Sequence, residues 1–137
     1  MNKEQFLVLA FGLFLLQSCS PDESIPIQDN LLLNTWHMQQ ISGGIAGINE
    51  QFDTDELTWT FLDNDSIEVQ NNVHPDSSKY LFCLFDSGTY SYTFTDTSGV
   101  QSLVIDQYHF NISDLTDTLL DLDNGAVADG FYYRLVK

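Results

Sequence analysis

Apolar and polar residues alternate in short runs through most of the chain after residue 56, which is the pattern of strands that bury one face. The clearest run extends from Thr89 to Phe94, where every second residue is aromatic. Aspartate, asparagine, serine and glycine, which favour tight turns, separate the runs at 63–66, 86–88 and 123–125. Since no segment after residue 30 has the apolar spacing of an amphipathic helix, we predict an all-β domain.

The runs predict eight or nine short strands, at residues 35–41, 57–61, 67–70, 80–85, 89–94, 102–105, 108–112, 120–122 and 131–136. The glycine-rich stretch 42–49 is expected to lie in a loop that ends near Asp55. Short connections favour antiparallel neighbours, and closing such a sheet removes its edges. We therefore predict an antiparallel up-and-down β-barrel of about eight strands, with a two-sheet β-sandwich as the alternative.

The N-terminal residues have a different pattern. A short polar start containing Lys3 is followed by an uninterrupted apolar run from Phe6 to Leu16. This run fits the hydrophobic region of a secretory signal, and it is shorter than the roughly 20 apolar residues that a membrane-spanning helix needs. The next residues, Leu-Gln-Ser-Cys at 16–19, resemble the lipobox of bacterial lipoproteins, in which the signal is removed before an acylated cysteine.

The lipobox resemblance implies a signal peptide at 1–18, an acylated Cys19 followed by a flexible tether through residue 30, and a folded domain at 31–137. Two or three acyl chains would hold the domain on a membrane, since each buried methylene contributes about 0.8 kcal/mol. Ser20 is not the aspartate that retains many such lipoproteins at the inner membrane. Residues 21–24 resemble the acidic export tag of Bacteroidota surface lipoproteins, which implies an outer-membrane anchor on the periplasmic or cell-surface face.

The charge of the chain argues against nucleic acid as a partner. The sequence has 4 basic and 20 acidic residues, for a net charge of -16. Such a surface repels phosphate backbones. A hydrophobic fraction of 43% and an aromatic fraction of 13% still allow the chain to bury a core, so the acidic composition does not predict disorder.

Two positions suggest a family. Asn-Thr-Trp at 34–36 opens the first expected strand, and Arg134 lies in the last one. This arrangement resembles the lipocalin-like domains of Bacteroidota lipoproteins and, more distantly, lipocalins, which have Gly-x-Trp and an arginine at these places. The glycine is absent here. The resemblance implies a barrel over 31–137, closed at one end by Trp36 packed against Arg134.

Aromatic residues at alternate strand positions would face one interior in such a barrel. The candidate cavity-lining residues are Trp59, Phe61, Phe82, Tyr90, Tyr92, Phe94, Tyr108 and Phe110. Two interpretations remain open. Either these rings line an apolar ligand cavity whose mouth is edged by residues 42–49, or they fill the interior as a solid core.

No residue pattern predicts catalysis or a metal site. The three histidines, at 37, 74 and 109, are not within four residues of one another or of Cys83, and no Gly-x-Ser-x-Gly motif occurs. Acidic turns at 53–55, 63–65 and 121–125 resemble calcium loops, but no glutamate follows Glu68, so turn chemistry or weak calcium binding explains them better than an EF-hand. Cys83 sits in an apolar run and is expected to be a small buried side chain.

We therefore expect a membrane-anchored, non-enzymatic protein without a cofactor. The first expectation is a lipocalin-like carrier of a small apolar or amphipathic molecule. The alternative is an interaction module, or an accessory subunit of an outer-membrane or cell-surface assembly.

Overall fold

A computed structural model describes residues 31–125 and 128–137, so the predicted signal peptide, Cys19 and tether lie outside the described residues. The described part is all-β apart from helical residues at 31–32 and one short 3-10 helix. The strands are β1 (Thr35–Gly43), β2 (Ile48–Gln51), β3 (Leu57–Phe61), β4 (Ser66–Asn71), β5 (Gly88–Thr97), β6 (Val100–Ile105), β7 (Tyr108–Leu115), β8 (Leu119–Asp123) and β9 (Phe131–Val136), and the 3-10 helix is η1 (Ser78–Phe82).

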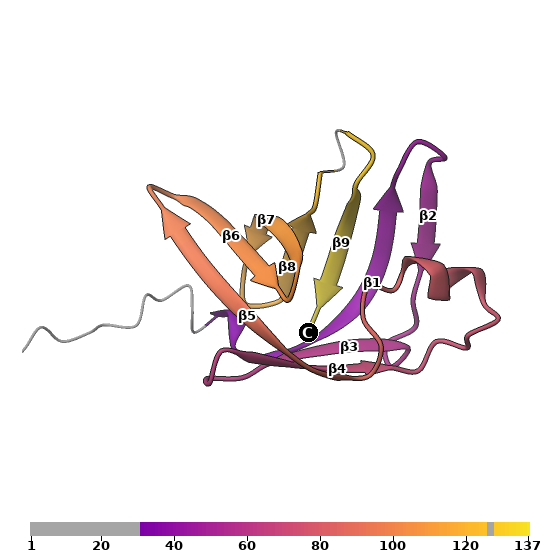
Figure 1. Cartoon of the computed structure of the whole chain (residues 1–137), viewed down its shortest axis with the longest axis horizontal. Coiled ribbons are helices and arrows are strands. Elements are labelled where there is room, and N and C mark those ends of the chain that lie inside the picture. The colour runs from indigo at the N-terminus through magenta and orange to yellow at the C-terminus, as the bar shows by residue number, and fades with distance from the viewer. Residues whose placement is uncertain (1–30, 126–127) are drawn as a thin grey trace, which may run out of the picture.

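The strands form one closed antiparallel barrel (Figure 1). Each strand from β3 to β8 pairs with the next, and β9 pairs with β1 from His37 to Gly43. β2 and β3 pair with successive parts of the same edge of β1. They therefore share one position in the barrel wall, which has eight strands around its circumference. The predicted up-and-down barrel is confirmed.

β5 changes partners along its length. Its first residues pair with β4 as far as Ser91, and from Tyr92 onward the strand pairs with β6. No register pair joins β4 to β5 beyond Ser91 in the described structure. The β5–β6 hairpin therefore projects away from the β3–β4 turn, as Figure 1 shows.

Two sequence predictions were wrong. Residues 80–85 are not a strand, because η1 begins after Ser77, whose hydroxyl oxygen caps it by accepting a hydrogen bond from the Lys79 backbone N–H. Residues 42–55 are not all loop, because they contain β2. Gly44 and Gly47 both have positive φ, which allows the tight turn that returns the chain alongside β1.

The core fills the barrel. The inward side chains of every wall strand except β2 contribute to one cluster of buried apolar residues. Large aromatic side chains occupy its centre, where Trp59 contacts Phe110 and Tyr133 with ring centroids 6.3 and 6.5 Å apart. Fully desolvated side chains of this size contribute strongly to stability, since burying a Phe side chain is worth about 1.5–3 kcal/mol.

Candidate functional site

The predicted cavity-lining residues all reach the barrel interior or its two ends, but they do not surround one cavity. Trp59, Phe61, Tyr92 and Phe110 are buried in the core. The other four, Phe82, Tyr90, Phe94 and Tyr108, are half-buried and pack against that core.

One end of the barrel is closed by the β4–β5 connection, residues 72–87. Phe85 from this connection is only 4% exposed. Its ring contacts Trp59 of β3 at 5.4 Å and Tyr108 of β7 at 5.3 Å between centroids. Because β3 and β7 lie on opposite sides of the eight-stranded wall, Phe85 spans the opening. We call this region, residues 72–87 with 128–131, the plugged end.

The glycine-rich turn, predicted to edge a cavity mouth, lies near the plugged end and is bonded to the two residues that directly precede β9. The Gly44 backbone N–H donates to the Gly130 carbonyl at 3.0 Å, and the Ile45 N–H donates to the Asp129 carboxylate at 2.8 Å. Phe131 packs against Phe82 of η1 at 5.8 Å between ring centroids. These contacts join the turn, η1 and β9 over the end of the barrel.

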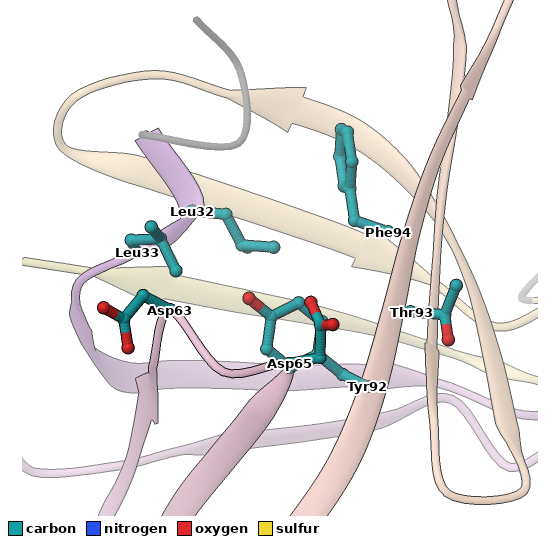
Figure 2. A pocket seen from close by; sticks show the side chains of 7 residues that line it. All are labelled: Leu32, Leu33, Asp63, Asp65, Tyr92, Thr93 and Phe94. Atoms are coloured by element: carbon teal, nitrogen blue, oxygen red, sulfur yellow. The ribbon is translucent and has the colours of Figure 1, made fainter. Parts of the chain in front are cut away.

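A pocket of about 450 Å³ lies instead at the opposite end. Its lining residues come from three segments: the N-terminal turn, the β3–β4 turn and the middle of β5. Figure 2 shows them: Leu32, Leu33, Asp63, Asp65, Tyr92, Thr93 and Phe94. We call this region, residues 31–34, 62–65 and 92–94, the pocket end.

The pocket lies where β5 extends past the end of β4. Ser91 pairs with Ser66, the first residue of β4, so the next residues of β5 have the β3–β4 turn beside them in place of a paired strand. Two bonds nevertheless hold the turn to β5: the Tyr92 hydroxyl donates to the Leu62 carbonyl at 3.0 Å, and the Tyr92 N–H donates to the Asp65 carbonyl at 2.9 Å. Since side chains alternate along a strand, Tyr92 and Phe94 share one face of β5.

The third wall of the pocket is the N-terminal turn. The Trp36 indole N–H donates to the Leu32 carbonyl at 3.0 Å, and the Phe61 N–H donates to the Asn34 carbonyl at the same distance. Leu32 is buried by these contacts, whereas Leu33 is half-buried beside the pocket. Across the pocket from both leucines lies Phe94 (Figure 2).

The polar groups of the pocket are acidic. Asp63 and Asp65 are both exposed, and no Lys or Arg is among the lining residues. Asp65 has a φ of 55°, a left-handed conformation that Asp and Asn tolerate in turns.

The predicted Trp36–Arg134 pair is wrong. Arg134 lies between the inward residues Tyr133 and Leu135, so its side chain points outward. There it forms a two-pronged ion pair with Asp121, at 2.9 and 2.7 Å, and this pair raises the pKa of the guanidinium. The cation over the Trp36 ring is the Lys137 ammonium, 5.2 Å from the ring centroid.

The candidate reactive side chains are dispersed. Nδ1 of His37 lies 2.6 Å from the Thr54 carbonyl oxygen, while His74 and His109 are exposed. Cys83 is half-buried, and burial raises the pKa of its thiol to about 11, so the protonated form predominates at neutral pH. Within residues 31–125 and 128–137, no group of three His, Cys, Asp or Glu side chains could hold a metal ion.

Comparison with known structures identifies a relative in fold. A crystal structure of a lipocalin-like protein from Bacteroides uniformis ATCC 8492, at 1.79 Å resolution, superposes with a TM-score of 0.50 at 14% identity, covering 78% of this chain and 98% of that one. The barrel is lipocalin-like. No protein-family model matches the chain, and no curated protein matches its sequence.

Sequence reasoning identified Tyr92 and Phe94 as lining residues but missed the other five. The two leucines precede the first predicted strand and match no strand pattern, and the two aspartates were predicted only as turn residues. In the described part of the chain, no helix has the length and apolar character needed to span a bilayer.

Proposed function

We propose that the protein is a non-enzymatic, acylated lipoprotein whose lipocalin-like barrel binds a small apolar or amphipathic molecule at the pocket end. The observation that carries this proposal is the pocket itself. Its volume of about 450 Å³ lies within the range of about 300–1,000 Å³ typical of ligand sites. Its walls are mainly Leu, Phe and Tyr side chains with a few polar groups, which is the usual composition of such sites.

The proposed anchor would place this pocket near a membrane. Residues 20–30 connect Cys19 to Leu31, which directly precedes the two pocket leucines. Even a fully extended segment of this length reaches only about 40 Å. A barrel held by acyl chains on Cys19 therefore has its pocket end within roughly this distance of the lipid surface, where amphipathic molecules are concentrated. We place the anchor in the outer membrane, on its periplasmic or cell-surface face.

The ligand proposal can be tested by native mass spectrometry of the purified full chain. We expect an extractable small molecule to accompany the protein. Phe94→Asn should abolish this, because it puts an uncharged polar amide into the apolar wall. Val100→Asn is the matched control, since Val100 is 66% exposed on the same hairpin. A ligand retained in Phe94→Asn would contradict binding at the pocket end.

The anchor can be tested separately. Labelled fatty acid should attach to the exported chain, and Cys19→Ala should release the protein from membranes. An unlabelled protein, or a Cys19→Ala variant that stays on the membrane, would contradict the anchor without affecting the pocket.

The alternative role, as an interaction module or accessory subunit, has less support. It requires an apolar patch outside the barrel. The large exposed apolar side chains of the described residues lie on separate elements: Ile45, Leu62, Leu81, Val100 and Tyr132. Single exposed apolar residues are normal on soluble surfaces.

A further inference from the structure

We propose that the pocket selects amphiphiles with a cationic headgroup. This inference rests on the proposed function, because it takes the pocket end as the binding site. It adds the chemical class of the ligand: an alkyl or aryl amine, whose apolar part contacts the leucines and Phe94 while its ammonium lies beside the two aspartates.

The apolar part of the site is formed by side chains from two segments. Leu32 and Leu33 come from the N-terminal turn, and Tyr92 and Phe94 from β5. Asp63 and Asp65 are exposed, so they stay hydrated when the pocket is empty and can meet a headgroup at its rim without being desolvated. This arrangement accommodates a molecule with one apolar end and one charged end.

The sign of the charge follows from the basic residues. None of the three basic residues of the described chain lines the pocket. Lys79 pairs with Glu56 at 2.7 Å and Arg134 pairs with Asp121, while Lys137 lies over the ring of Trp36, whose indole is bonded to Leu32 at the pocket end. An anionic headgroup would therefore meet two carboxylates and no cation among the lining residues, on a chain whose net charge is -16. An ammonium would be attracted by the same groups.

The preference should be modest, because both carboxylates are exposed and screened by solvent. We expect decylamine to bind on the order of tenfold more tightly than decanol at low ionic strength, and decanoate to bind more weakly than either. Raising the salt concentration should reduce the decylamine preference and leave decanol binding unchanged.

The experiment is calorimetric titration of the purified full chain with decylamine, decanol and decanoate at pH 7 and below their aggregation concentrations. In the Asp63→Asn, Asp65→Asn double variant, decylamine affinity should fall to that of decanol, while decanol affinity stays the same. Asparagine keeps the turn, because it also tolerates the left-handed conformation of residue 65. The Asp53→Asn, Asp55→Asn variant is the matched control, since it removes two exposed carboxylates of identical spacing outside the pocket.

The outcomes separate the two proposals. Equal binding of all three amphiphiles to the unaltered chain would overturn the charge selection but leave the pocket as a binding site. A preference lost equally in both double variants would show an effect of overall charge and would also overturn it. No binding by any amphiphile would contradict the proposed function itself. Binding of decylamine only after Ile25→Ser, Ile27→Ser substitution would show that the chain's own N-terminal segment is the occupant, and the inference would be wrong.

Discussion

Apolar side chains fill one end of this barrel and line a pocket at the other end. At the plugged end the β4–β5 connection crosses the opening, and Phe85 makes ring contacts with Trp59, Tyr90 and Tyr108. At the pocket end, β5 extends past the first residue of β4, and a space remains between Phe94 and the N-terminal leucines.

A lipocalin-like wall therefore does not by itself determine where a pocket forms. The wall strands are similar at both ends, and the connections decide which end is filled. Residues 72–87 are long enough to fold over the barrel, whereas the β3–β4 turn at 62–65 is too short to cover the space beside it. We expect substitutions at the plugged end to affect mainly stability, and substitutions at the pocket end to affect mainly binding.

The largest effect is expected from Phe85→Ala. It should lower the free energy of unfolding by about 3–5 kcal/mol, because it removes a buried ring that contacts three aromatic neighbours. Urea unfolding followed by tryptophan fluorescence measures the loss. Leu81→Ala, at a position that is 81% exposed on the same connection, should change stability by less than about 0.5 kcal/mol. Equal effects of the two substitutions would contradict the idea that Phe85 plugs the barrel.

A smaller effect is expected at the pocket end from Tyr92→Phe. This change removes the hydrogen bond from the Tyr92 hydroxyl to the Leu62 carbonyl and should cost about 1 kcal/mol. It should also weaken ligand binding, because that bond holds the β3–β4 turn at the pocket. Tyr132→Phe, on the outer face of β9, is the control for loss of a hydroxyl. Unchanged unfolding and binding in Tyr92→Phe would show that the bond does not position the turn.

The smallest effect is expected at the ion pair between Glu56 and Lys79 of η1, which lies at the plugged end. Hydrogen bonds from the Lys79 ammonium and the Asp53 N–H lower the pKa of the Glu56 carboxyl. A lowered folded-state pKa stabilises the protein at pH values above the unfolded-state pKa, and this contribution is lost as the pH falls through the folded-state value. Glu56→Gln should therefore cost about 0.2–1 kcal/mol at pH 7 and progressively less in acid.

The control for this pH dependence is Glu68→Gln, which removes an exposed carboxylate on β4. Thermal unfolding from pH 7 to pH 3 makes the comparison. A difference between Glu56→Gln and the unaltered chain that grows on acidification would have the wrong sign for this ion pair.

Much of the fold could be predicted because strand alternation is a local signal. The run from Thr89 to Phe94 marks β5, and the inward positions of β3 and β9 are apolar. The same signal places Arg134 outside, since Tyr133 and Leu135 on either side of it face inward. The resemblance to lipocalins instead predicted that Arg134 packs against Trp36, and that prediction was wrong because Lys137 lies over the Trp36 ring.

The remaining features depend on contacts between distant segments. The 80–85 run is apolar at nearly every position, which does not distinguish a buried strand from a short helix packed over a barrel end. The pocket depends on how far β5 extends past the end of β4 and on the turn that brings Leu32 and Leu33 beside Phe94. No spacing along the sequence carries that information.

The most direct test of the central claim is an NMR titration of the full chain, labelled at leucine methyl and tryptophan indole groups, with decanol. We predict saturable shifts at Leu32 and Leu33 of the pocket end, with Leu84 of the plugged end unchanged. The Trp59 indole N–H is buried without an acceptor among the described residues, so it would report a ligand inside the barrel. Shifts at Trp59 and Leu84 with none at Leu32 or Leu33 would contradict binding at the pocket end.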